Sequence, residues 1–362
     1  MSDEHDPLVT EADAIAGVPL PRAQTRLIGH EHAEAEILDA YRSARMHHAW
    51  ILAGPKGIGK ATLAFRFARF ALAHPDARSA EVGAATSLAL PDDHPDVRKI
   101  AGGAHPGLLH LKRPYDPKRK GKDKIRQDLT VDEIRRTVPF FGSTGSEGSW
   151  RICIVDAADD MNANAANALL KILEEPPRNS LFLVIAHSPG RLLPTIRSRC
   201  RTLRLHELSE AQVGEGLSML GVAETGSRIA ERAATLSQGS LRKAIRLAEG
   251  ETIDIADRFS ALAARFPELD VEAAHDLADT ISRNGAEDGW TLFQDLVADH
   301  LHQAVRGGAS GPLDRLVSMA EVWEKTTHAA READAFNLDR KQIVLNAFRD
   351  LAEAARGQGV SS

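Results

Sequence analysis

The sequence predicts an α/β domain built on a parallel sheet, followed by regions that are all helical. Short apolar segments alternate with helical patterns from about residue 30 to 205, the order typical of a parallel sheet with helices on both faces. A glycine-rich phosphate-binding motif follows the first apolar segment. Beyond about residue 207 only helical patterns remain, which predicts that the rest of the chain is helical.

Length and composition are those of a globular chain with two or three domains. The chain has 362 residues, of which 43% are apolar and 27% charged. The net charge of −6 argues against a surface that coats nucleic acid as a whole, although it allows a local basic patch. Cys153 and Cys200 lie in apolar or motif-like stretches, which predicts reduced thiols in a cytoplasmic protein. The sequence has no C-x-x-C pair, so we expect no zinc module. Neither a secretory signal nor an apolar run of roughly 20 residues is present.

The first elements lead into the phosphate-binding motif. Residues 1–26 predict a flexible N-terminal arm, and residues 31–46 show the apolar periodicity of a helix. Residues 48–53, HAWILA, predict a short buried strand. After the glycine loop, LAFRFARFALA predicts a helix over residues 63–73 that ends before Pro75.

The middle of the chain contains a variable insertion and then resumes the α/β order. Residues 76–130 are rich in Ala, Asp, Pro and Gly and include the basic run 112–126, so we expect no regular α/β alternation there. Residues 130–133, TVDE, have the pattern of a capping box that opens a helix. Later segments predict three more strands and a helix between the first two: WRICIVD (150–156), NANAANALLKILEE (162–175), SLFLVIA (180–186) and TLRL (202–205).

The stretch AGPKGIGKAT, residues 53–62, fits most of the phosphate-binding motif G-x-x-x-x-G-K-[ST]. Its glycines allow backbone N–H groups to converge on phosphate oxygens, and Lys60 reaches the outer phosphates. The next position should bind magnesium through a hydroxyl, but it is Ala61. Thr62 lies one residue further along the helix, where its side chain is rotated by about 100°. The loop therefore lacks its metal ligand.

A second chemical group is missing after the strand that ends in Asp156. A strand-end aspartate is the usual metal-side acid, and hydrolysis normally needs an adjacent glutamate that orients the attacking water. Residue 157 is alanine, and Asp159 cannot take this place without rearrangement. Asp156 fits equally well as an acid that caps the following helix. Because each loss typically costs orders of magnitude in rate, the two together argue against hydrolysis at this chain's own site.

Residues 189–205, PGRLLPTIRSRCRTLRL, are dense in arginine. Such a run is usually a solvated basic face. Alternatively, an arginine at a domain edge completes the phosphate site of a neighbouring subunit, where it neutralises the charge that develops during phosphoryl transfer.

Several of these stretches together resemble the bacterial clamp-loader AAA+ subunits, over most of residues 27–350. The combination of ALLKILEEPP with a downstream SRC is highly specific, whereas the phosphate loop alone is not. The resemblance implies an AAA+ RecA-like domain at 27–206, a helical lid at 207–252 and a helical collar or oligomerisation domain at 253–362. The matching stretches are LIGHEHAEAEI, HHAWILAGPKGIGK, VDAADDMNANAANALLKILEEPP, LPTIRSRC, GSLRKAIRL and NLDRKQIVLNAF.

The resemblance also implies a function. The chain would be a largely non-hydrolysing stator of the DNA polymerase III holoenzyme, with Arg199 as an arginine finger that acts in trans on ATP bound by an adjacent gamma/tau subunit. Its partners would be the gamma/tau and delta subunits and, through the complex, the sliding clamp and primer–template DNA during replication, with no membrane. It would need no cofactor. The degenerate nucleotide-binding set, which can bind ATP or ADP without hydrolysis, would be Gly54, Gly57, Gly59, Lys60, Thr62, Asp156 and the sensor residue Arg242.

Two departures from the family and two alternatives follow from the same residues. Many relatives place a four-cysteine zinc module after the phosphate-loop helix, and this sequence has none, so we expect no zinc or other metal. The segment AHSP (186–189) lacks the polar pair common in motor subunits.

One alternative is an active ATPase of the gamma/tau type, which Ala61 and Ala157 disfavour. The other is direct DNA binding through residues 112–126, where a solvated loop is favoured because Tyr115 is the only aromatic residue.

Overall fold

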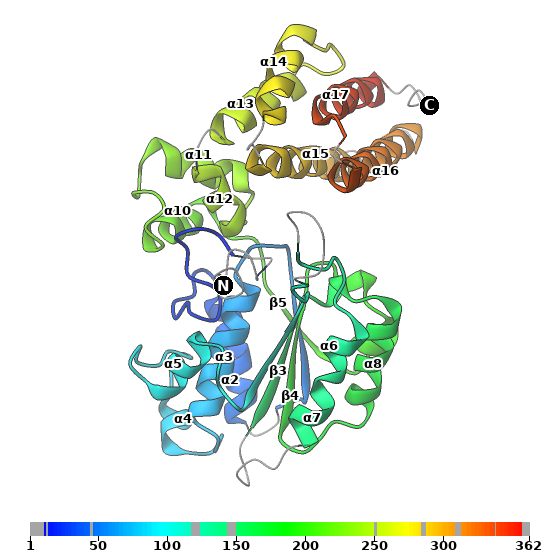
Figure 1. The fold of residues 1–362 in the computed structure, drawn as a ribbon. Helices are drawn as coiled ribbons and strands as arrows, with labels where there is room; N and C mark the ends of the chain where they lie inside the picture. Colours follow the sequence, from blue (N-terminus) through cyan, green and yellow to red (C-terminus); the bar gives the residue numbers. More distant parts are fainter. Residues whose placement is uncertain are drawn as a thin grey trace. The chain divides into compact units, whose positions relative to one another are not determined.

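The computed structural model forms two compact units. The first runs to Thr225 and also includes Gln238–Arg242, and the second comprises Gly226–Ser237 and the chain from Lys243 onward (Figure 1). The division into arm, AAA+ domain, lid and collar stays a prediction. The residues that the structure describes are 11, 14–43, 46–116, 124–142, 150–249, 252–283, 287–307, 313–336 and 338–356.

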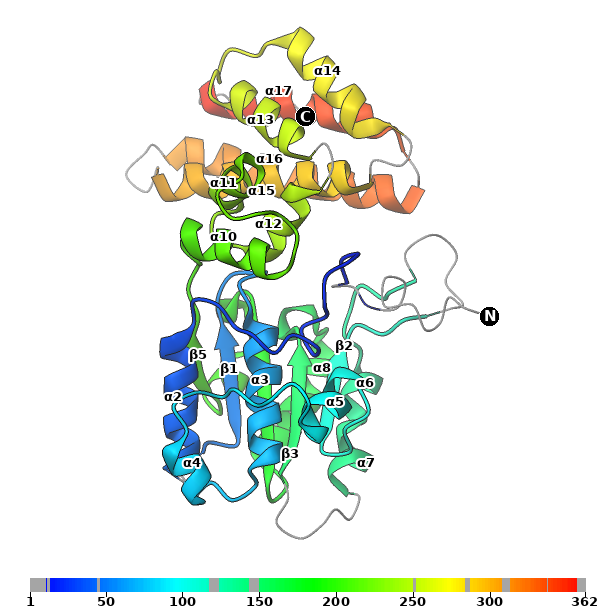
Figure 2. The ribbon, with the colours of Figure 1, turned by 90° about the vertical axis from the view of Figure 1, so that its left-hand side faces the viewer.

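A five-stranded sheet of order β2-β3-β4-β1-β5 forms the centre of the first unit (Figures 1 and 2). All neighbouring strands are parallel, so the predicted parallel α/β sheet is confirmed. Every side chain of β1 and β4 is buried, which explains their continuous apolar sequences. The strands are β1 (Ala49–Ala53), β2 (Leu108–Lys112), β3 (Arg151–Asp156), β4 (Ser180–Ala186) and β5 (Arg201–Arg204).

Helices cover both faces of this sheet (Figure 2). Alternate residues of the strands point to opposite faces, and each face has its own apolar cluster. One cluster involves α2 (Glu31–Arg42), α3 (Lys60–Ala73), α4 (Ala80–Ala84) and α5 (Pro95–Ala101). The other involves α6 (Val131–Arg135), α7 (Thr137–Gly142), α8 (Ala163–Glu174) and α9 (Pro194–Arg197). Two single-turn 3-10 helices, η2 (Ala158–Asp160) and η3 (Pro189–Arg191), follow β3 and β4.

The segment 76–130 contains a strand that the sequence did not predict. β2 is the edge strand of the sheet and pairs with β3 in the register Leu108↔Ile152. The expectation of no α/β order in this segment is therefore wrong for residues 108–112. Because β2 is short and only its second and fourth residues are buried, its apolar alternation is weak. The centre of the predicted basic run, residues 117–123, lies outside the described residues.

The capping box predicted at residues 130–133 does not form. Helix α6 does begin at Val131 with Thr130 as its N-cap, but the Thr130 side chain makes no capping hydrogen bond. Its backbone carbonyl accepts the N–H of Ile134 at 3.3 Å, the ordinary first hydrogen bond of the helix. The sequence pattern thus located the start of the helix without the side-chain geometry that defines a capping box.

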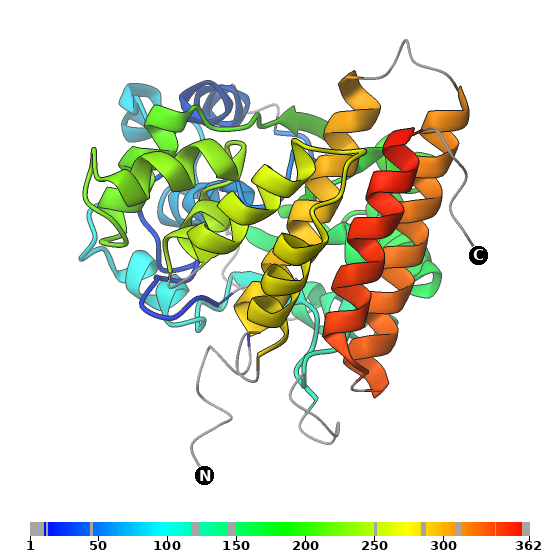
Figure 3. The same cartoon turned by 90° about the horizontal axis from the view of Figure 1, so that it is seen from above.

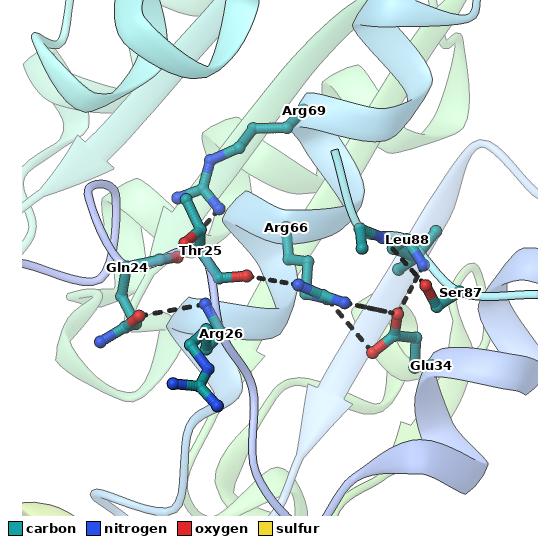
Figure 4. Close-up of polar contacts among 9 residues, drawn as sticks. Gln24, Thr25, Arg26, Glu34, Arg66, Arg69, Ser87 and Leu88 are labelled. Carbon is teal, nitrogen blue, oxygen red and sulfur yellow. Dashed lines mark hydrogen bonds and ion pairs between the residues drawn. The ribbon is translucent and has the colours of Figure 1, made fainter. Parts of the chain in front are cut away.

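Gln24 and Thr25, near the end of the predicted N-terminal arm, contact α3 (Figure 4). The buried Arg69 donates Nη1 to the carbonyl of Gln24 at 2.9 Å. Arg66 donates Nη1 to the carbonyl of Thr25, and its Nη2 lies 3.1 Å from Oε1 of Glu34 in α2. Burial lowers the pKa of Arg69 to about 10, which leaves its guanidinium charged at neutral pH. The sequence did not predict these contacts, because the partners are 32 to 45 residues apart in the chain.

The second unit is helical, as predicted for the C-terminal region. Its aromatic core joins Phe259, Phe293 and Phe348, with ring centroids 5.6 to 6.1 Å apart. The long helices α15, α16 and α17 pack against one another in sequence (Figure 3). Among the described residues, no helix has the length and apolar character required to cross a bilayer. The helices after β5 are α10 (Glu210–Met219, in the first unit), α11 (Arg228–Ser237), α12 (Leu241–Ala248), α13 (Thr252–Ala263), α14 (Val271–Ser282), α15 (Glu287–Gly307), α16 (Leu313–Phe336) and α17 (Arg340–Arg356).

Candidate functional site

The glycine loop connects the carboxyl end of β1 to the start of α3. Gly54, Gly57 and Gly59 have φ angles of +152°, +82° and +109°, which side chains disfavour. A Cβ at Gly57 would also lie 2.4 Å from Oγ of Ser240, and one at Gly54 would lie 2.3 Å from the carbonyl oxygen of Leu205. The glycines are therefore required by the turn and its close packing, whether or not a nucleotide binds.

Lys60 folds back onto its own loop. Its Nζ donates to the carbonyl of Gly54 at 2.6 Å and also to that of Pro55, and the residue is only 3% exposed. Burial lowers the pKa of Lys60 to about 8, and the nearby carboxylates of Asp159 and Asp156 oppose that shift. In a working phosphate site this ammonium faces the outer phosphates, whereas here it is bound by loop carbonyls.

Asp156, the last residue of β3, and Asp159, three residues later, both have partners within the chain. Oδ2 of Asp156 lies 3.4 Å from Nε2 of His110, a residue of the unpredicted strand β2. The two carboxylate oxygens of Asp159 accept the backbone N–H groups of His187 and Ser188 at 2.6 and 2.7 Å. Asp159 therefore ties the turn after β3 to the end of β4. This engagement supports the expectation that Asp159 does not act as the water-orienting acid.

A cleft of about 90 Å³ opens beside Asp156. Typical small-molecule sites have volumes of about 300–1,000 Å³, so this cleft is small for a nucleotide. Several of its charges are paired: Glu11 of the arm contacts Lys112 at 2.9 Å, and Arg113 contacts Asp160 at 3.2 Å. Burial, together with the charge of Lys60, lowers the pKa of His187 to about 4, so this imidazole is neutral at pH 7. The cleft is lined by Glu11, Leu20, Pro21, Arg22, Lys56, Phe65, His110, Lys112, Arg113, Asp156, Ala157, Asp160 and His187.

The predicted sensor residue lies against the glycine loop within the first unit. The backbone N–H of Arg242 donates to the carbonyl of Gly57 at 3.1 Å. Oγ of Ser240 donates to the carbonyl of Lys56 at 3.0 Å. Thr62 lies in the first turn of α3, half-buried. Of the predicted nucleotide-binding set, the structure thus brings the three glycines, Lys60, Asp156 and Arg242 to the carboxyl end of the sheet.

Arg199 lies at the opposite, amino end of the sheet. It lies between α9 and β5. Strand β5 pairs in parallel with β1, from Trp50 opposite Arg201 to Ala53 opposite Arg204. Arg199 therefore precedes its strand, whereas the glycine loop follows β1. At about 3.3 Å per residue, the paired strands separate the two ends by roughly 15 Å. The loop and Arg199 of one chain cannot form a single phosphate site.

Three acceptors contact the guanidinium of Arg199. Nη2 lies 2.9 Å from Oε1 of Glu174, the last residue of α8. Nη1 donates to the carbonyl of Thr195 at 3.0 Å and to Oγ of Ser198 at 3.5 Å. The Arg199 side chain is 36% exposed, so solvent and other molecules can reach it. Our sequence reasoning missed Glu174, and no fixed spacing links it to Arg199, although it lies in the specific stretch ALLKILEEPP.

Comparisons with known proteins identify relatives in DNA replication. Residues 29–209 match the family model described as "DNA polymerase III, delta subunit". A DNA polymerase III subunit delta' from Pseudomonas aeruginosa is 36% identical over 157 residues, which is 43% of this chain and 42% of that protein. A subunit delta' from Bacillus subtilis is 34% identical over 183 residues, 50% of this chain and 49% of that protein.

A different subunit type also matches part of the chain. The DNA polymerase III subunit gamma from Buchnera aphidicola is 28% identical over 235 residues, 63% of this chain and 58% of that protein. The chain thus spans about half the length of the curated relatives that it matches.

Proposed function

The chain belongs to the DNA polymerase III delta subunit family, and on this basis we propose that it is a delta'-type clamp-loader subunit that does not hydrolyse ATP. In this proposal it is a stator that presents Arg199 to ATP bound by an adjacent gamma/tau subunit, in the cytoplasm. The gamma/tau and delta subunits are its direct partners, and the sliding clamp and primer–template DNA are engaged through the complex.

The observation that carries this proposal is the separation of the glycine loop from Arg199 across the sheet. An arginine finger must reach the phosphates, and Arg199 is too far from its own chain's loop to do so. Its half-exposed guanidinium can meet a second chain instead. The strongest support for a silent local site is the absence of both the metal-binding hydroxyl and the water-orienting acid, at Ala61 and Ala157.

The glycine loop itself has a more limited role in this proposal. It can bind ATP or ADP without hydrolysis, but Lys60 must first leave the carbonyls of Gly54 and Pro55. We therefore expect any affinity to be weak, because that rearrangement subtracts from the binding free energy. No cofactor or zinc is required. Residues 207–252 and 253–362 serve as the lid and the collar that joins the subunits.

The test is ATP turnover by a complex reconstituted from this chain with gamma/tau and delta subunits. Arg199→Ala should slow turnover at the site that faces this chain by about a thousandfold, the size of effect known for arginine fingers. Arg191→Ala is the matched control, because it removes the same charge from the same arginine-rich run but follows β4, at the other end of the sheet. A normal rate in the Arg199→Ala complex would show that the finger assignment is wrong.

An active gamma/tau-like ATPase is the second candidate, favoured by the gamma relative that matches 63% of the chain. It predicts steady ATP hydrolysis by the isolated chain, abolished by Lys60→Ala. Hydrolysis of that kind would reject the stator proposal, whereas its absence, together with a slow Arg199→Ala complex, would reject the motor.

A further inference from the structure

The contacts of Arg199 define a small cradle made by two helices. Glu174 ends α8, and Thr195 and Ser198 belong to the α9 turn just before β5. Their side chains and backbone place a carboxylate, a carbonyl and a hydroxyl around one guanidinium, at 2.9, 3.0 and 3.5 Å. The cradle therefore fixes the end of a long side chain that would otherwise sample many rotamers.

The electrostatics of the cradle favour a cation at this position. The last carbonyl groups of a helix lack intrahelical partners and carry partial negative charge. Glu174 adds a full negative charge at the same end of α8. A guanidinium beside Glu174 is therefore attracted both by the carboxylate and by the helix terminus.

The cradle leaves part of the guanidinium for another acceptor. Arginine has five N–H donors on three nitrogens, and the contacts within the described part of the chain involve Nη1 and Nη2. A guanidinium can bind phosphate oxygens through two N–H groups at once. Because the Arg199 side chain is 36% exposed, Glu174 and a phosphate can contact it at the same time.

The ion pair contributes little to the stability of the fold. The side chains of Arg199 and Glu174 are 36% and 44% exposed, and pairs of that exposure are strongly screened by water. A positional effect is different, because orienting a group before the reaction removes an entropic cost from the transition state. The pair is therefore suited to orienting Arg199 rather than to stabilising the chain.

We propose that Glu174 is a positioning residue for Arg199, holding the guanidinium in place for contact with a phosphate on the neighbour. This rests on the proposed function of Arg199 as a finger in trans. Glu174 does not touch the nucleotide; it acts only through Arg199.

The experiment uses the reconstituted complex and measures kcat and KM for ATP. Glu174→Ala should lower kcat by about tenfold with an unchanged KM, because the orientation of Arg199 stabilises the transition state and does not affect the binding of ATP. Glu174→Gln keeps an acceptor oxygen without the charge and should lose less. Glu175→Ala is the matched control, since it removes an equally exposed carboxylate from the next residue and should leave kcat unchanged.

A second pair of variants separates this proposal from the one on which it rests. In an Arg199→Ala background, Glu174→Ala should have no further effect on kcat. If Glu174→Ala lowers kcat in that background as much as it does in the chain that keeps Arg199, Glu174 acts independently and the positioning role is overturned. If Arg199→Ala slows turnover and Glu174→Ala does not, positioning by Glu174 is wrong while the finger stands. If Arg199→Ala itself turns over normally, the finger proposal fails, and the inference about Glu174 fails with it.

Discussion

The two ends of the parallel sheet carry charged side chains in opposite circumstances. At the carboxyl end, the Lys60 ammonium is buried against loop carbonyls, and both oxygens of Asp159 accept backbone N–H groups. At the amino end, Arg199 and Glu174 form a pair that is more than a third exposed. The first set of charges is used to hold the turns together, whereas the second set remains accessible to another molecule.

A recognisable sequence motif and a functional group that other molecules can reach therefore need not lie at the same place in the fold. The glycine loop has the positive φ angles that its motif allows. The Lys60 ammonium and the Asp159 carboxylate nearby, however, are hydrogen-bonded within the chain. Arg199 is not among the residues that line the cleft beside Asp156, yet we propose that it is the group that acts on a neighbour. The comparison therefore predicts that substitutions at the carboxyl end change stability, while substitutions at the amino end change only the activity of the complex.

The largest expected effect on stability comes from the buried Lys60. Its pKa is lowered from 10.5 to about 8 in the folded chain, so between these values the unfolded chain binds more protons than the folded one. Stability should therefore rise with pH from about 8 to 10.5, by about 3 kcal/mol from this group. Denaturant unfolding at several pH values should show that this rise is absent in Lys60→Met.

Variants of Lys60 also test whether the two ends of the sheet differ in their importance for the complex. We expect Lys60→Met and Lys60→Ala to leave clamp loading by the assembled complex nearly unchanged, because the local site is not the one that hydrolyses ATP. A strong loss of loading with an intact fold would show that nucleotide binding at this loop has a function, and the contrast between the two ends would then be wrong.

The next effect concerns Asp159, the carboxylate that joins the turns after β3 and β4. Asp159→Ala leaves the N–H groups of His187 and Ser188 without their charged acceptor, which should lower the free energy of unfolding by about 2 kcal/mol. Urea unfolding of the isolated chain measures this. The exposed Asp39 provides a control, since Asp39→Ala removes only a surface contact with Arg42 and should change stability by less than about 0.5 kcal/mol.

Much of the fold and part of the site geometry could be predicted from the sequence. The strands β1 and β4 are continuous apolar runs because both faces are covered, and the positive φ angles of the loop demand glycines that are visible as a motif. The edge strand β2 could not be found, because only Leu109 and Leu111 are buried in a short segment. The roles of the site residues stay predictions.

Contacts between distant parts of the chain could not be predicted either. Asp159 meets the N–H of His187, 28 residues later, only because β3 and β4 are neighbours in the sheet. Glu174 meets Arg199 because α8 ends at the amino end of the sheet, where β5 begins. Single-sequence patterns report local periodicity, and these partners depend on strand order, which no local pattern contains.

A smaller effect is expected at Gly57, which tests how closely the loop is packed. Gly57→Ala places a Cβ at a φ of +82°, 2.4 Å from Oγ of Ser240 and 2.8 Å from Cβ of Arg242. We expect a loss of about 1.5 kcal/mol, from the backbone conformation and from the shift that these two contacts require. The matched control is Gly83→Ala in α4, where nothing lies within 4 Å of the added Cβ and alanine favours the helix. Equal stabilities of the two variants would contradict the packing described here.

The smallest expected change in stability is at the amino end. Glu174→Ala should alter the free energy of unfolding by less than about 0.5 kcal/mol, because the pair with Arg199 is exposed and screened. Thermal or urea unfolding of the isolated chain, compared with Glu175→Ala, measures this directly. A loss as large as that of Asp159→Ala would mean that Glu174 holds α8 and α9 together, and a slower complex would then report a damaged fold. A loss near zero excludes a damaged fold as the cause of a slower complex, and the Arg199→Ala background then distinguishes orientation of Arg199 from an independent action of Glu174.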